Sequence, residues 1–160
     1  MSIVLDGTTG ITTPALDSAA QFSSADMPAG SVIQTVHNVV SGNRGSGTQN
    51  IVQVAFTPKF STSKVFITGH TCVYVPAGST CSVDLYIDST FLYRSAGGVG
   101  WGVNARNEDC SVNYLYQLSS GGGVTFTLQG LHISGGAPSW NYYDSQNTGN
   151  SSITIMEIAA

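Results

Sequence analysis

The chain has 160 residues, of which 41% are hydrophobic and only 9% are charged, and its formal net charge is −4. This length fits one domain with a substantial core. The few, scattered Lys and Arg residues exclude nucleic-acid binding through clustered cations. No apolar run approaches the roughly 18 residues of a membrane span, so we expect a soluble protein without membrane insertion.

The first 30 residues carry neither a helix pattern nor a strand pattern. Gly7, Gly10 and Pro14 interrupt any helical run, and the basic and apolar regions of a signal peptide are missing. We therefore expect an extended N-terminal anchoring arm over residues 1–30 and a separate domain over residues 31–160. The apolar arm residues expected to make its contacts are Ile3, Leu5, Ile11, Leu16 and Phe22.

From residue 31 onward, short β-branched runs alternate with turn residues, and this pattern predicts strands. The predicted strands are residues 31–40, 50–57, 63–75, 83–88, 110–118, 124–133 and 151–160. Within residues 63–75, Val65, Ile67 and Val73 are expected to share one face of the strand, opposite His70. The absence of any long helical pattern predicts an all-β fold, an antiparallel β-sandwich of jelly-roll-like type.

Three glycine-containing or serine-containing connections separate neighbouring strands. Residues 41–47 are predicted as a flexible hairpin loop, and residues 119–123 as a further hairpin. Residues 76–79 form a Pro-Ala-Gly-Ser turn, across which simple hairpin pairing would place Cys72 and Cys81 on one face. Each of these predictions assumes that consecutive strands pair with each other.

The cysteines are odd in number, at Cys72, Cys81 and Cys110. An odd number cannot form a complete disulfide set, and buried thiols in a reducing compartment are the favoured interpretation. A bridge between the first two remains the alternative.

Metal and cofactor chemistry is not indicated. The three histidines fall on separate predicted strands, without a carboxylate or cysteine at short metal-ligand spacing, and they are His37, His70 and His132. No glycine-rich run opens a helix that could receive a phosphate. We expect no metal and no cofactor.

Catalytic residues are not indicated either. The acid pairs, Asp84 with Asp88 and Glu108 with Asp109, are interpreted as solvated strand and loop residues. A glycosidase needs two carboxylates placed across a bond, one of them with a raised pKa. A Gly-x-Ser-x-Gly nucleophile turn is also missing. We therefore expect a protein that is not an enzyme.

Two long glycine-rich loops carry the aromatic residues with the strongest functional pattern. Residues 95–104 contain Trp101, and residues 134–143 contain Trp140, Tyr142 and Tyr143. Such side chains combine apolar area with a hydrogen-bonding tip, so they suit ligand recognition or an interface. The alternative is that each Trp packs over an end of the sandwich or contacts another subunit.

Four segments carry a resemblance to a known group of proteins. The leader, residues 3–16, resembles the segment that precedes the terminal domain in many bacteriophage tail-fibre-like and virion structural proteins. Further similar segments are residues 30–36, the passage from residues 56–58 to 63–65, and residues 152–158. The resemblance implies a virion surface protein with a β-sandwich head and no cofactor.

 For assembly, the resemblance implies a homotrimer located in the virion, put together in the host cytoplasm.

The leading functional expectation is a non-enzymatic phage virion structural protein of the capsid decoration or cement type. Its arm would dock on the major capsid protein or other virion proteins, or around its trimer mates. A tail fibre would also carry a tail-attachment domain and a repetitive shaft, and we expect neither in this chain. The alternative is a receptor-binding or adhesin module of a tail or head fibre that recognises a host-surface glycan or protein through the aromatic loops.

Overall fold

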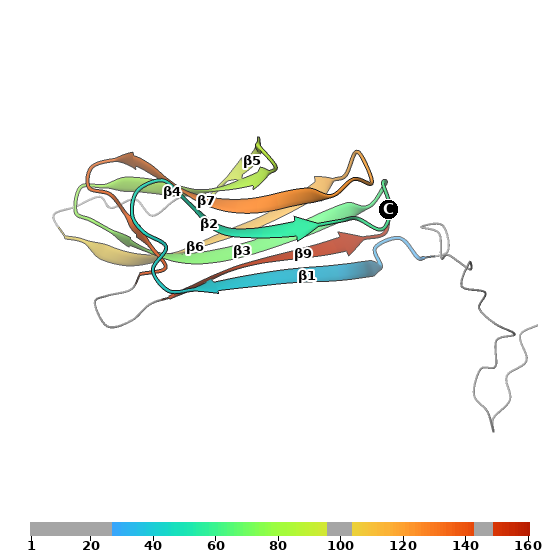
Figure 1. Cartoon of the computed structure of the whole chain (residues 1–160), viewed down its shortest axis with the longest axis horizontal. Coiled ribbons are helices and arrows are strands. Elements are labelled where there is room, and N and C mark those ends of the chain that lie inside the picture. The colour runs from blue at the N-terminus through green and yellow to red at the C-terminus, as the bar shows by residue number, and fades with distance from the viewer. Residues whose placement is uncertain (1–26, 96–103, 143–148) are drawn as a thin grey trace, which may run out of the picture.

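The computed structural model describes residues 27–95, 104–142 and 149–160, and these residues form strands joined by turns and irregular connections (Figure 1). The predicted arm residues 1–26 lie outside the described residues. The strands are β1 (Val32–Ser41), β2 (Gln49–Phe56), β3 (Lys64–Val75), β4 (Thr80–Ile87), β5 (Thr90–Arg94), β6 (Arg106–Gln117), β7 (Val124–Ser134), β8 (Ser139–Trp140) and β9 (Asn150–Ile158).

The strands form two antiparallel sheets that pack face to face (Figure 1). The first sheet has the order β1-β9-β3-β6, with the two-residue β8 paired to β3, and the second has the order β2-β7-β4-β5. Leaving β8 aside, successive strands alternate between the sheets except at β4 and β5, and the first strand pairs with the last. This interleaved order is that of a jelly roll. The predicted antiparallel β-sandwich is confirmed.

The three hairpin predictions are wrong. Residues 41–47, 76–79 and 119–123 each carry the chain from one sheet to the other, so the strands that they join do not pair. A two-residue turn at Asp88 and Ser89 does form a hairpin, between β4 and the unpredicted β5. Asp88 has a positive φ of 51° there, as tight hairpin turns require.

The core lies between the sheets and follows the alternation of each strand. On β3, Val65, Ile67 and Val73 are buried and face inward, as predicted, in one cluster with Leu128 of β7. Gly69 lies on the same face, where an added Cβ would come 2.5 Å from Leu128 Cδ1. Any side chain at this position would therefore force the Leu128 side chain to move within the packed core.

Trp140 closes one end of the core. Its side chain is fully buried, its ring lies against Gly130 of β7, and its Nε1 donates a hydrogen bond to the Gly47 carbonyl (2.6 Å). Two backbone hydrogen bonds also hold the loop at residues 41–47 in place. Trp140 N donates to Gly45 O (3.0 Å), and Gly47 N donates to Pro138 O (2.9 Å). The loop predicted as a flexible hairpin is therefore bound to the segment around β8.

The opposite end holds the start of β1 next to the C-terminus (Figure 1). Gly30 N donates to Ala159 O (3.0 Å), and Ala159 N donates to Ser31 O (2.9 Å). These two bonds fix the point at which the N-terminal segment meets the sandwich.

Candidate functional site

The structure separates the aromatic residues that the sequence grouped together. Trp101 and Tyr143 lie outside the described residues, as do all five predicted arm contacts. Trp140 is buried in the core and offers no surface to a ligand. Tyr142 packs edge-on against Tyr74 of β3, with ring centroids 5.8 Å apart.

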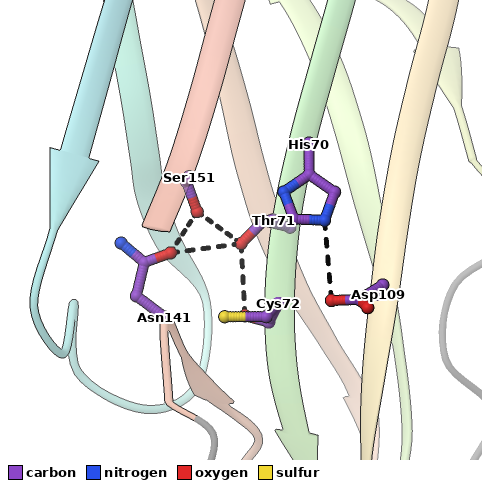
Figure 2. A network of polar contacts seen from close by, with 6 residues as sticks. All are labelled: His70, Thr71, Cys72, Asp109, Asn141 and Ser151. Carbon is purple, nitrogen blue, oxygen red and sulfur yellow. Dashed lines mark hydrogen bonds and ion pairs between the residues drawn. The ribbon is translucent and has the colours of Figure 1, made fainter. Parts of the chain in front are cut away.

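A buried polar network follows Trp140 along the chain (Figure 2). Asn141 is fully buried with a positive φ of 56°, and its Nδ2 donates to the Val40 carbonyl (3.1 Å). The Ser151 hydroxyl contacts Asn141 Oδ1 and lies 2.6 Å from Thr71 Oγ1. The network joins β1, β3 and β9 to the segment after β8, and satisfied buried groups of this kind fix the local geometry.

A neighbouring surface pair is also visible in Figure 2. His70 Nε2 lies 3.5 Å from Asp109 Oδ1, across β3 and β6, and both side chains are about half exposed, at 48% and 58%. An exposed pair of this kind contributes little to stability. Among the described residues, no group of three or more His, Cys, Asp or Glu could hold a metal ion.

The interpretation of Asp84 as a solvated acid is wrong. Asp84 is fully buried and accepts a bidentate pair of bonds from Arg94, at 2.9 Å to Nε and 2.8 Å to the terminal nitrogen. Ser82 Oγ adds a third bond (3.1 Å). The bonds and the charge of Asp84 raise the pKa of Arg94 above its ordinary value. The pair fastens β5 to β4, and Asp88 stays exposed in the turn.

Glu157 is a buried carboxylate that the sequence analysis missed. It lies at an inward position of β9 with no exposed surface. Its oxygens accept bonds from Lys59 N (2.9 and 3.0 Å), Phe60 N (3.0 Å) and Gln34 Nε2 (2.6 Å). The sequence carried a signal for this burial. Glu157 stands at the next inward position after two isoleucines on β9, where the alternation predicts an apolar residue.

All three cysteines are buried thiols, and no disulfide joins them. Burial raises the pKa of the Cys81 thiol to about 12, with further contributions from Cys110 and Glu108. Burial and the charge of Asp109 also raise the pKa of Cys72. The Cys72 and Cys81 thiols therefore stay protonated at neutral pH, and a protonated thiol is a poor nucleophile.

The outer face of the β1-β9-β3-β6 sheet is apolar at the end where β1 begins. Phe66 of β3 is paired with Met156 of β9 on one side and with Leu115 of β6 on the other. Leu115 is 54% exposed, and Val32 at the start of β1 is 56% exposed. We call the three residues Met156, Phe66 and Leu115 the apolar row.

The outer face of the other sheet carries a polar depression of about 220 Å³. Its lining residues alternate along the strands with core residues, so they point away from the core. They come from β2, β7, β4 and the β4–β5 turn, and include Asn50, Gln53, Thr127, Gln129, Tyr86 and Asp88. We call this depression the sheet-face pocket.

The fold is a jelly-roll β-sandwich that carries the apolar row on the outer face of one sheet and the sheet-face pocket on the outer face of the other. The described part of the chain contains no helix long and apolar enough to cross a membrane. No protein-family model matches the chain, and no curated protein matches it either.

Comparison with solved structures finds a distant similarity to this chain. The chain is similar to a chain in the structure of infectious bursal disease virus, Gx strain, with 12% sequence identity and a TM-score of 0.41. The match covers 81% of this chain and 33% of that chain. A likeness of this size carries no argument about function, since one fold hosts many functions.

Proposed function

We propose that the protein is a non-enzymatic structural protein of a phage virion, of the capsid decoration type, held to the particle by its N-terminal arm. The observation that supports the proposal is where the N-terminal segment joins the sandwich, which is where an arm would exit. The bonds between Gly30, Ser31 and Ala159 lie at the end of the sandwich that carries the apolar row, in which Leu115 is 54% exposed.

The position of this exit supports an anchoring role. An arm that leaves beside an exposed apolar surface allows one end of the molecule to make both contacts with the particle. The row on one side of it is uncharged, with Thr154, Thr68 and Asn113 aligned across the sheet, and Lys64 lies in the row on the other side. The apolar row and its uncharged neighbour are inexpensive to desolvate, because burying an unpaired charge is what makes association costly.

The mechanism is multivalent docking. Each arm would contribute shallow apolar contacts from Ile3, Leu5, Ile11, Leu16 and Phe22, and main-chain hydrogen bonds. In a homotrimer, three arms engage the capsid together, which raises the avidity without any new contact. Jelly rolls serve in viral capsids and also in lectins, so the fold suits this role by analogy.

Removing residues 1–26 tests the proposal. The truncated chain begins at Met27 and keeps the bonds of Gly30, so we expect an unchanged thermal unfolding midpoint but no binding to particles that lack the protein. Co-sedimentation with the particles and electron microscopy measure the occupancy. Full occupancy by the truncated chain would contradict the docking role.

A matched pair of variants within the arm sharpens the result. Leu5→Ser with Ile11→Ser removes apolar contacts and should lower the occupancy, whereas Thr8→Ser with Thr12→Ser should leave it unchanged. The adhesin alternative, with Trp101, Trp140, Tyr142 and Tyr143 as the site, would require Trp140 on the surface, where it does not lie.

A further inference from the structure

We propose that the sheet-face pocket binds one ring of a neutral glycan. The pocket is separate from the apolar row and the arm, so this inference goes beyond the proposed function and does not depend on it. Its residues also differ from the aromatic loop residues that the sequence singled out.

A β-bulge builds one wall of the pocket. Asn50 and Gln53 are three residues apart, and in a regular strand they would point to opposite faces of the sheet. The register of β2 against β7 shifts between Asn50 and Val52, and both Ile51 and Val52 are buried. The extra residue therefore turns both amide side chains to the outer face, which is a common use of bulges beside binding sites.

The amides are held in place and keep unused hydrogen-bonding capacity. Gln53 Nε2 donates to Thr127 Oγ1 (3.0 Å), and Gln129 Nε2 donates to Asn50 Oδ1 (3.0 Å). Each Gln still has its carbonyl oxygen as an acceptor, and Asn50 still has its amide nitrogen as a donor. Sugar hydroxyls both donate and accept, so a preformed mixture of amide donors and acceptors matches them.

The other side of the pocket supplies an aromatic ring and a fixed carboxylate. Tyr86 is braced by Phe91, edge to face, with ring centroids 5.8 Å apart. Asp88 is bonded to β7 through its N–H to Thr125 O (2.7 Å) and through Oδ1 to Thr125 N (2.9 Å). The ring offers an apolar surface to sugar C–H groups, and the second oxygen of Asp88 remains an acceptor.

Charge and size select the ligand class. No Lys or Arg lines the pocket, and the nearby Arg94 is engaged by Asp84. With Asp88 as its charged residue, the pocket disfavours phosphate and acidic sugars. Its volume of about 220 Å³ is below the range of drug-sized sites, so it fits one ring while the rest of the chain stays outside.

NMR titration of the ¹⁵N-labelled full chain tests the inference. The probes are the methyl glycosides of galactose, glucose, mannose and N-acetylglucosamine, with N-acetylneuraminic acid as the acidic comparison. We expect at least one neutral glycoside to shift the side-chain amide signals of Asn50, Gln53 and Gln129 with a millimolar dissociation constant. The acidic sugar should bind more weakly.

Two alanine variants provide the control. Asn50→Ala should weaken binding roughly three- to tenfold, as expected for one lost hydrogen bond. Asn113→Ala removes an exposed amide from the other sheet and should leave the affinity unchanged. The inference is overturned if no neutral glycoside shifts these signals, if Asn50→Ala binds as tightly as the original chain, or if the acidic sugar binds more tightly.

Discussion

At the scale of single residues, Glu157 shows how a buried carboxylate is accommodated by neutral hydrogen-bond donors of the described chain. Its partners are two backbone N–H groups and the amide of Gln34, and all of them donate. Gln34 Nε2 also donates to the Thr57 carbonyl (2.8 Å). A flip of the Gln34 amide would therefore lose both of these hydrogen bonds. The carboxylate therefore organises the loop after β2 and the start of β1 together.

Glu157→Gln should destabilise the protein by about 1–3 kcal/mol, because the new NH₂ group would face donors. Chemical denaturation followed by circular dichroism measures the free energy of unfolding. Glu108→Gln is the control, since Glu108 is paired with the half-exposed Arg106 and should cost about 0–1 kcal/mol. Equal losses in the two variants would contradict the organising role of Glu157.

At the scale of elements, the contact between β7 and β8 requires a glycine on β7, because the Trp140 ring of β8 lies directly against Gly130. A Cβ added to Gly130 would lie 2.1 Å from the Trp140 ring. The ring cannot retreat without giving up the bond from Nε1 to the Gly47 carbonyl. Glycine is therefore required at position 130, because any side chain there would occupy the space of the Trp140 indole.

Gly130→Ala should lower the free energy of unfolding by about 1–3 kcal/mol through overpacking. Gly122→Ala is the matched control, because its nearest neighbour would be 3.8 Å away, and its effect should stay within about 0.5 kcal/mol. In a double-mutant cycle, Trp140→Phe should recover part of the loss. If the effects of Gly130→Ala and Trp140→Phe on the free energy of unfolding are strictly additive, the Trp140 ring is not the cause of the loss.

Strand positions were predictable, but strand pairing was not. The alternation of residues 63–75 placed Val65 and Ile67 inward correctly, because burial on one face leaves a period of two in the sequence. The loops at 41–47 and 119–123 show where the chain reverses, and nothing in their residues says that the next strand joins the other sheet. β8 was missed because its pairing depends on contacts with β3, far away in sequence.

The candidate surfaces were harder to predict for the same reason. The sheet-face pocket unites Asn50, Tyr86 and Gln129, which come together only through the register of three strands. The bulge that turns Asn50 outward leaves no mark in the local composition. Trp140 stood out as an aromatic residue in a glycine-rich loop, but that pattern does not distinguish a lid over the core from a ligand platform.

At the scale of the whole molecule, the two outer faces of the sandwich carry the two candidate surfaces. One face carries the apolar row and the other carries the sheet-face pocket. Under the proposed docking, covering the apolar row by the particle is favourable. The sheet-face pocket would then point outward, where a glycan can reach it.

Leu115→Asp should therefore lower the occupancy of particles that lack the protein, because it places a charge at the exposed end of the apolar row. Co-sedimentation with the particles measures the loss. Asn113→Asp, two residues away on the same strand, introduces the same charge outside the row and should bind as the original chain does. Full occupancy by the Leu115→Asp variant would remove the row from the contact with the particle.

The pairing of β1 with β9 has a consequence for synthesis on the ribosome. β9 lies between β1 and β3 in its sheet, yet it follows all the other described strands in the chain. Until it emerges, β1 and β3 have no strand between them and the core remains open. The sandwich can close only after β9 has emerged, so its folding is dominated by contacts between distant residues, which makes it slow.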